Sequence, residues 1–328
     1  MRVTVGIPTR NRSSVLEECL LTLTRQTRKP DEVFVCNDAS TDDTETILNL
    51  YRERFSKIGV ALHFYTFPFQ QRQAICRNFI ASHAIGDILA FLDDDVLCPE
   101  GWLASLVPPF DQGDAIGAVG GPAIVVDKNF DFCSDIIYDH NPKSLHRFSR
   151  YGAHKGYFHC WVPDSIRESD FLCGGNMAIR KNVFQEVGSS DVRLKGHCQA
   201  EEVDLFIRIK RRGYKILYEP RALVYHRYHQ SGARPSPRIY WYYSGYNHMM
   251  FLLKHFKKPG TFLRLAFCFR KSPTPIPGVL IASFLMKGNF ARLWQILGYV
   301  DCLTGRDRLQ GENPNEVYPS SSYNPTHL

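Results

Sequence analysis

The feature that most constrains the fold is an apolar run at residues 88–92 that leads directly into Asp93, Asp94 and Asp95. A continuous apolar run of this length is typical of a strand buried on both faces, as in a parallel sheet. Three carboxylates cannot stay unpaired in that core, because burying a charge without a partner is strongly unfavourable. We therefore expect the aspartates to lie where the strand ends, either on a solvated acidic turn or as oxygen ligands for a divalent cation.

Strand-like and helix-like segments alternate along the first hundred residues. Apolar or β-branched runs at residues 3–7, 32–36, 60–67 and 88–92 predict strands, and the segments between them carry apolar residues at helical spacing. This alternation predicts an α/β fold with a mostly parallel, Rossmann-like sheet and helices on both faces. Ligands of such sheets bind at the carboxyl ends of the strands.

Polar and charged residues follow three of these predicted strands. They are Pro8, Thr9, Arg10 and Asn11 after the first strand, Asp38 after the second, and Asp93, Asp94 and Asp95 after the fourth. Because the carboxyl ends of parallel strands meet at one edge of the sheet, these side chains are predicted to form a single binding site.

The second half of the chain is predicted to complete the sheet and to cover this site. Residues 117–126 predict one further strand, and residues 127–168 have so little periodicity that we expect a long excursion there. Gly174 and Gly175 precede another apolar strand. Glycines at such positions permit another group to approach the backbone closely.

An acidic cluster opens a predicted helix at residues 201–209. Glu201, Glu202 and Asp204 lie in its first turn, where negative charge interacts favourably with the helix dipole. A later predicted strand ends at His226, and a lone histidine there is more often structural than a ligand. From the residues alone, each of these features has a structural explanation as well as a functional one.

Composition and motif content disfavour several classes of protein. The chain has 328 residues, of which 44% are hydrophobic and 22% charged, which is typical of a globular protein. Neither a glycine-rich dinucleotide fingerprint nor a P-loop follows the first predicted strand, which disfavours hydride-transfer enzymes and P-loop NTPases. The ten cysteines form no CxxC pair, and several lie in apolar runs. Because free thiols are typical of a reducing compartment, we expect a cytoplasmic protein.

Taken in order, these motifs resemble those of family 2 glycosyltransferases, which have the GT-A fold, including the rhamnosyltransferase-like group. The resemblance covers roughly residues 1 to 230. The matching segments are Pro8-Thr9-Arg10-Asn11-Arg12, Asn37-Asp38-Ala39-Ser40-Thr41-Asp42, Ala74-Ile75-Cys76-Arg77-Asn78, Phe91-Leu92-Asp93-Asp94-Asp95, Gly174-Gly175-Asn176-Met177, Gly188 onward and Glu201-Glu202-Val203-Asp204-Leu205.

The resemblance implies a role for each of these positions. The nucleotide of a sugar donor would be held by Pro8, Thr9, Arg10, Asn11, Asp38, Arg72, Asp93 and Asp94. A Mn²⁺ or Mg²⁺ ion would be held by Asp95, Asp93 and His226, and the acceptor or sugar by Gly174, Gly175, Asn176 and Asp204. The catalytic base would be Glu202 or Glu201. The family commonly has aspartate at the second position of this acid pair, so Glu202 is a departure from its pattern.

The resemblance therefore implies inverting, metal-dependent sugar transfer. We expect one sugar to be added per encounter, because the Gln-x-x-Arg-Trp signature of processive synthases is absent after the acid pair. UDP is the default nucleotide, and dTDP and GDP stay open. The acceptor is expected to be a hydroxyl of a saccharide or of a lipid-linked molecule. Two alternatives remain: a polyprenyl-phosphate sugar transferase, and a non-catalytic protein that binds sugar nucleotides.

The segment beyond this region is basic. Residues 231–300 contain ten Lys and Arg residues and no acid, whereas the whole chain carries a net charge of +7. We expect a glycosyltransferase domain at residues 1–230, with nucleotide-binding (1–100) and acceptor (101–230) halves, a basic helical extension at 231–309 and a disordered tail at 310–328. The aromatic and basic extension suits either an anionic membrane surface or a helical cap, and no nucleic-acid-binding motif accompanies it.

Overall fold

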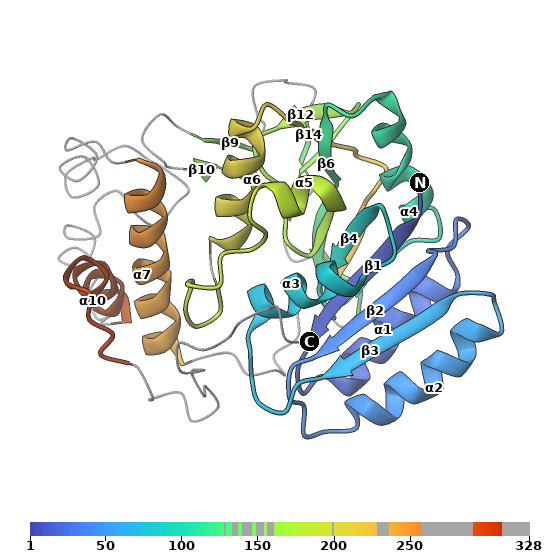
Figure 1. The fold of residues 1–328 in the computed structure, drawn as a ribbon, viewed down its shortest axis with the longest axis horizontal. Helices are drawn as coiled ribbons and strands as arrows, with labels where there is room; N and C mark the ends of the chain where they lie inside the picture. Colours follow the sequence, from blue (N-terminus) through green and yellow to red (C-terminus); the bar gives the residue numbers. More distant parts are fainter. Residues whose placement is uncertain are drawn as a thin grey trace.

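The computed structural model describes residues 1–127, 129–132, 137–139, 146–148, 154–155, 161–198, 200–227, 236–256 and 291–309. Its centre is an eight-stranded sheet with the order β12-β14-β6-β13-β4-β1-β2-β3 (Figure 1). The strands are β1 (Val3–Thr9), β2 (Glu32–Asn37), β3 (Ala61–Thr66), β4 (Ile88–Leu92), β6 (Ile116–Gly120), β12 (Arg167–Ser169), β13 (Asn176–Arg180) and β14 (Lys215–Tyr218).

Helices cover both faces of the sheet. The described helices are α1 (Ser13–Thr24), α2 (Thr44–Ser56), α3 (Gln73–His83), α4 (Trp102–Leu106), α5 (Lys181–Glu186), α6 (Glu201–Arg211), α7 (Pro237–His255) and α10 (Ala291–Thr304), with a 3-10 helix at Pro108–Gln112. Three small sheets pair β5 (Val96–Leu97) and β7 (Ala123–Val126) with β15 (Val224–Arg227), β8 (Ile137–Asp139) with β11 (Trp161–Pro163), and β9 (Arg147–Phe148) with β10 (His154–Lys155).

The predicted parallel sheet is confirmed for the first four strands. β3, β2, β1 and β4 are neighbours and all run parallel. β13 runs antiparallel between β4 and β6, and β12 runs antiparallel to β14 at the edge. The sheet is therefore mixed, and its parallel part brings the ends of β1, β2 and β4 together.

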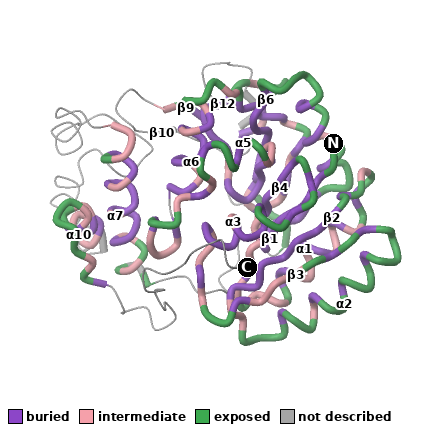
Figure 2. Tube along the Cα trace, in the orientation of Figure 1, coloured by how far each residue is buried: buried purple, intermediate pink, exposed green. Residues whose placement is uncertain are grey.

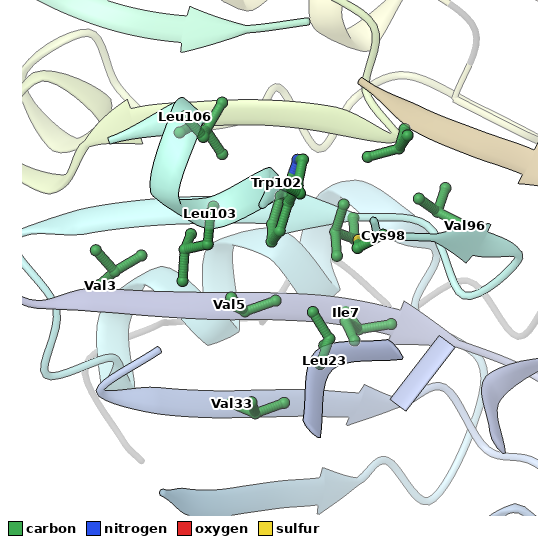
Figure 3. Close-up of a cluster of buried hydrophobic side chains, with 14 of the residues drawn as sticks. Val3, Val5, Ile7, Leu23, Val33, Val96, Cys98, Trp102, Leu103 and Leu106 are labelled. Carbon is green, nitrogen blue, oxygen red and sulfur yellow. The ribbon is translucent and has the colours of Figure 1, made fainter. Parts of the chain in front are cut away.

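Alternate residues of the strands supply two cores, one on each face of the sheet. Val33 and Val35 of β2 pack with α1, α2 and α4, whereas Phe34 and Cys36 pack with α3, α5 and α6. Figure 3 shows part of the first core, which includes Trp102 of α4, Val5 of β1 and Val33 of β2. Strands buried on both faces explain the continuous apolar runs of the sequence. Figure 2 shows this burial along β1 and β4, and the exposed outer side of α2.

The single strand predicted at residues 117–126 is instead two strands that belong to different sheets. The chain leaves the main sheet after β6 and enters the small sheet as β7, with Gly121 and Pro122 between them. An ideal Cβ on Gly121 would lie 2.2 Å from the carbonyl oxygen of Ala222, so glycine is required at this close crossing. The small sheet matters for the site, because β15 pairs with β5, immediately after the three aspartates.

Helices α7 and α10 lie side by side at one end of the molecule, next to α6 (Figure 1). Phe251 and Leu252 of α7 belong to the core that α3 and α6 also form. Within the described residues, no helix is long and apolar enough to span a membrane. The predicted tail at 310–328 and most of the basic residues of the extension lie outside the described residues.

Candidate active site

A cavity of about 720 Å³ opens at the carboxyl ends of β1, β2 and β4. Its size is in the range of ligand pockets in proteins. Two walls come from the loops after β1, β2 and β4, and a third comes from residues 196–198 and from α7. The lining residues are Pro8, Thr9, Arg10, Arg12, Asp38, Gln70, Arg72, Gln73, Cys76, Asp93, Asp94, Asp95, Gly196, His197, Cys198, His226, Tyr240 and Trp241. The polar residues predicted after three strands thus lie around one cavity, except Asn11.

Asp94 is the most enclosed of the three aspartates. It is buried, and its carboxylate accepts hydrogen bonds from Thr9 Oγ1 at 2.7 Å and from Arg12 Nη1 at 2.6 Å. Burial raises the pKa of Asp94 to about 6, although the Arg12 charge opposes that rise. Thr9 and Asp94 therefore bond to each other in this structure, and together with Arg12 they fix the loop after β1 against the end of β4.

Asp95 faces His226, which β15 brings in from the far end of the sequence. The Asp95 carboxylate lies 3.0 Å from His226 Nε2 and 3.0 Å from Arg12 Nη1. The backbone supports this contact, since His226 pairs with Val96 and the N–H of Arg227 donates to the carbonyl of Asp95. Burial alone would raise the pKa of Asp95, but the hydrogen bond and charge of His226 and the charge of Arg12 lower it below its ordinary value.

Asp93, Asp95 and His226 form a set of potential metal ligands. One ligand atom from each lies within 4.8 Å of the others. Two carboxylates and one imidazole are the oxygen and nitrogen donors that suit Mn²⁺, and carboxylates also suit Mg²⁺. The chemistry of these three side chains therefore fits a divalent cation.

The predicted nucleotide-side residues are mostly engaged with one another. The carboxylate of Asp38 accepts hydrogen bonds from the backbone N–H groups of Gln71 and Arg72, and burial raises its pKa. Arg10 donates to the carbonyl of Asp38 at 2.9 Å. The side-chain oxygen of Asn11 accepts from the N–H of Thr41 at 2.7 Å, so Asn11 joins two loops outside the cavity lining.

Arg72 stands at a strained point of the chain. It directly precedes α3 with a φ of 76°, a conformation that is costly for a residue with a side chain. Its guanidinium donates to the carbonyl of Leu194 at 2.9 Å while the residue also lines the cavity. This conformation connects the end of β3 to the start of α3 beside the cavity.

The two glutamates at the start of α6 have different surroundings. Glu201 is buried, accepts a hydrogen bond from Ser190 Oγ at 2.6 Å and lies 3.1 Å from Arg77 Nη1. Glu202 has a side chain that is 27% exposed, and it lies 3.7 Å from the same Arg77 nitrogen. Burial raises the pKa of Glu202 to about 7; the Glu201 and Asp93 charges add to the rise, and Arg77 opposes it. Of the pair, Glu202 is the accessible carboxylate.

The two glycines before β13 make room for carboxylates of the protein itself. An ideal Cβ on Gly174 would lie 2.1 Å from Glu202 Oε1, and one on Gly175 would lie 2.9 Å from Asp93 Oδ2. The sequence predicted a close approach to the backbone at these positions, and the structure confirms it. The groups that approach in this structure are Glu202 and Asp93.

Two residues that the resemblance assigned to the acceptor have their side chains turned into the protein. The Asn176 amide donates to the carbonyls of Pro122 and Ala222 and accepts from Trp102 Nε1 at 2.9 Å, with no exposed surface. It fastens β13 to the crossing between the two sheets. The carboxylate of Asp204 is buried in an ion-pair cluster between α6 and α7. We therefore assign both side chains a structural role in place of acceptor binding.

Several residues around the site were not predicted individually. Arg12 and Arg77 stand within motifs that the sequence analysis singled out, but their ion pairs with the aspartates and glutamates depend on contacts between distant segments. Tyr240 and Trp241 of α7 line the cavity, and the ring of Tyr240 stacks on His197 with centroids 4.6 Å apart. The only sequence signal for the second group is the aromatic run at the start of α7.

Solved structures with the same architecture are GT-A glycosyltransferases. The mannosyltransferase PcManGT from Pyrobaculum calidifontis, in complex with GDP-Man and Mn²⁺, superposes with a TM-score of 0.58 and 19% identity, over 93% of this chain and 88% of its own. S. aureus TarS 1-349 in complex with UDP-GlcNAc gives a TM-score of 0.61 and 16% identity, over 94% and 82%. At these identities the likeness shows the fold alone. The fold is therefore GT-A, as the sequence predicted.

Sequence comparison identifies the family within this fold. A profile described as glycosyl transferase family 2 matches residues 4–188. The pre-mycofactocin glycosyltransferase of Mycobacterium tuberculosis is 28% identical over 228 residues, which cover 68% of this chain but 42% of the relative. The chain thus spans less than half the length of that relative. It belongs to glycosyl transferase family 2.

Proposed function

We propose that the protein is an inverting, metal-dependent and nonprocessive glycosyltransferase that moves a sugar from a nucleoside diphosphate to an acceptor hydroxyl. UDP is the preferred candidate nucleotide, and dTDP and GDP are alternatives. The observation that carries the proposal is the arrangement of Asp93, Asp95 and His226 at one cavity, with Asp93 and Glu202 both paired to Arg77. This arrangement would place a cation site near a candidate base.

The cation would be held by Asp93, Asp95 and His226, and when bound it would stabilise the negative charge that develops on the departing diphosphate. Mn²⁺ in the Pyrobaculum neighbour supports this proposal, as does the donor set in this chain. Arg10, Arg12 and Arg72 also line the cavity. Planar guanidinium groups suit phosphate oxygens, so these residues are our candidates for holding the diphosphate.

We assign the base to Glu202 because a general base must both accept a proton and reach the substrate. Glu201 meets neither need well, since Ser190 and Arg77 already engage its buried carboxylate. The pKa of Glu202, raised to about 7, suits a group that takes a proton at neutral pH. A single base that activates the acceptor hydroxyl opposite the leaving group gives direct displacement, and therefore inversion at the anomeric carbon.

The acceptor is proposed to be a saccharide or a lipid-linked molecule that presents a hydroxyl. A polyprenyl-phosphate acceptor would already be ionised and would need no strong base, so a requirement for Glu202 argues against that alternative. Donor binding without any turnover would instead favour the non-catalytic alternative.

The experiment is a nucleotide-release assay with UDP-, dTDP- and GDP-sugars in the presence of Mn²⁺, each tested with saccharide and lipid-linked acceptors. Glu202→Gln should leave nucleotide affinity intact and reduce transfer by about a hundredfold or more. Asp114→Asn is the matched control, because Asp114 is exposed and lies before β6, away from the cavity. Transfer by Glu202→Gln at the wild-type rate would contradict the assignment of the base.

A further inference from the structure

The side chain of Arg77 occupies an unusual position, behind the cavity and not in its lining. It is fully buried on α3 and lies between the loop after β4 and the first turn of α6. One terminal nitrogen, Nη2, donates to Asp93 Oδ1 at 3.3 Å and to the carbonyl of Gly174 at 3.0 Å. The other, Nη1, lies 3.1 Å from Glu201 and 3.7 Å from Glu202.

We propose that Arg77 is a positioning residue, whose guanidinium holds the base Glu202 and the donor-side carboxylate Asp93 in one fixed arrangement for glycosyl transfer. This inference rests on the proposed function, since it concerns the same active site. One nitrogen of the rigid guanidinium plane donates to Asp93, and the other lies in ion-pair range of Glu201 and Glu202. A shift of either carboxylate would therefore break a contact with Arg77.

The electrostatics require a permanent cation at this point. Removing a guanidinium from water is unfavourable unless acidic partners compensate it. Arginine keeps its proton in proteins, and the carboxylates of Glu201, Asp93 and Glu202 lie 3.1 to 3.7 Å from its terminal nitrogens. Three carboxylates surround this one cation, so the cluster keeps an excess of negative charge. Arg77 thus stays charged and lowers the repulsion between Asp93 and the base.

The local packing leaves no freedom for a different arrangement. Gly174 brings its backbone so close that a Cβ there would lie 2.9 Å from Arg77 Nη2 and 2.1 Å from Glu202 Oε1. Lysine at position 77 would keep the charge but would offer a single ammonium in place of a two-sided plane. Arginine is therefore the side chain that can contact both sides at once.

A purely structural role for Arg77, in which it only neutralises Glu201, makes a different prediction. If this were its only role, an Arg77 variant would be less stable than the wild type, but the folded variant would keep the wild-type kinetics. Arg180 supplies the comparison, because its side chain is mostly buried and donates to the carbonyls of Ile116 and Phe110 away from the cavity. Arg180→Lys should change stability without changing turnover.

The test measures nucleotide affinity, kcat, KM and the pH profile of kcat/KM for Arg77→Lys and Arg180→Lys. In Arg77→Lys, kcat should fall by about tenfold to a hundredfold, because small displacements of reacting groups have effects of that size. The acid limb of the profile should move to higher pH, because the cation that opposes protonation of Glu202 is weakened. A folded Arg77→Lys with the wild-type kcat and profile would overturn the proposal.

A second variant keeps the test decisive if Arg77→Lys does not fold. Glu201→Gln preserves the shape of its side chain and removes a like charge, so the acid limb should move to lower pH. The charged or titratable groups that act on Glu202 are Arg77, Glu201, Asp93 and Cys173. An unchanged profile in Glu201→Gln would show that this cluster does not control the base, and would overturn the proposal.

The proposed function and this inference can fail separately. Titration of the Glu202 carboxyl by ¹³C NMR, assigned by its loss in Glu202→Gln, needs neither substrate nor activity. A wild-type protein without sugar transfer would defeat the proposed function. A Glu202 titration that is the same in wild type, Arg77→Lys and Glu201→Gln would defeat the inference about Arg77.

Discussion

At the scale of single residues, the properties of the site depend on which cations and hydrogen-bond donors lie beside each of its carboxylates. Asp94 bonds to Thr9 and Arg12, Asp95 lies against His226, and Asp93 contacts Arg77. The three consecutive aspartates therefore have three different sets of partners. Burial raises the pKa of Asp94, whereas His226 and Arg12 lower that of Asp95. Of these two, Asp95 stays ionised to lower pH and is therefore better suited to a cation.

The pair of Asp95 and His226 predicts a pH dependence for metal binding. Burial alone would lower the pKa of His226, but its contact with Asp95 raises the pKa above its ordinary value of 6.5. A protonated imidazole cannot ligate a metal, so Mn²⁺ affinity should fall as the pH decreases through the raised pKa of His226. Mn²⁺ titrations of the wild type and of His226→Gln test this. The variant should bind more weakly at neutral pH and lose that part of the pH dependence; an identical pH dependence in both would contradict the assignment.

Sequence reasoning reached some of these residues and not others, for physical reasons. The aspartates were predicted because a local pattern, a buried strand followed by acids, allows few positions in a fold. Asn176 was assigned to the acceptor by resemblance, but a local motif does not say whether an amide at a strand end faces the cavity or the core. Arg77 was missed because its partners come from three segments that only the folded chain brings together.

At the scale of elements, a cluster of buried charges joins α6, which carries Glu202, to α7. Asp204 of α6 accepts from Arg208 and from His255 at 2.7 Å, and it lies 2.7 Å from Lys254 Nζ. Burial alone would raise the pKa of Asp204, but these partners lower it. Its contribution to stability is therefore present above the ordinary range of an aspartate and is lost as the pH falls through the lowered pKa.

Breaking this cluster should destabilise the protein. Asp204→Asn removes the carboxylate that Arg208, Lys254 and His255 share, and we expect the free energy of unfolding to fall by about 3 to 5 kcal/mol. Urea denaturation at neutral pH measures the change. Glu186→Gln is the control, because Glu186 pairs with Arg212 on the surface, where such pairs contribute about 0 to 1 kcal/mol. Equal effects of the two substitutions would contradict the proposed importance of the cluster.

Some elements of the fold follow from the local sequence, whereas others depend on contacts between distant segments. β1 to β4 lie within a few residues of their predicted positions, and α1 to α3 lie in the segments between them, because each has its own local periodicity. The division of residues 117–126 into β6 and β7 depends on a crossing at Gly121 with a distant segment. That crossing places β15 beside β5, so the position of His226 also depends on it.

At the scale of the whole molecule, α7 and α10 form a close helix pair, and α7 contributes to the cavity. An ideal Cβ on Gly245 of α7 would lie 2.1 Å from the carbonyl oxygen of Gln295 in α10. Asn247 of α7 bonds to both the N–H and the carbonyl of Lys195, and so holds the loop that lines the cavity at residues 196–198. Lys254 is engaged in ion pairs with Asp191 and Asp204. Among the described residues, these contacts support the cap alternative for this helix.

The close packing of α7 against α10 predicts an unusual effect of Gly245→Ala on the free energy of unfolding. Replacing glycine by alanine inside a helix normally stabilises it, by about 1 kcal/mol. Gly245→Ala should instead lower the free energy of unfolding by about 1 to 3 kcal/mol, since the added methyl meets backbone that cannot rotate away. Gly101→Ala is the control, because nothing lies near its Cβ position. Stabilisation by Gly245→Ala in thermal denaturation would contradict the close packing of α7 and α10.

The central claim is that the residues around Asp95 form the cation-dependent donor site of a glycosyltransferase. Calorimetric titration with UDP, dTDP and GDP, each with and without Mn²⁺, tests it most directly, with Asp95→Asn and the control Asp114→Asn measured alongside. We predict that one nucleotide binds tightly only with Mn²⁺, that Asp95→Asn abolishes the effect of the metal, and that Asp114→Asn does not. Nucleotide binding that is unchanged by Mn²⁺ or by Asp95→Asn would contradict the account.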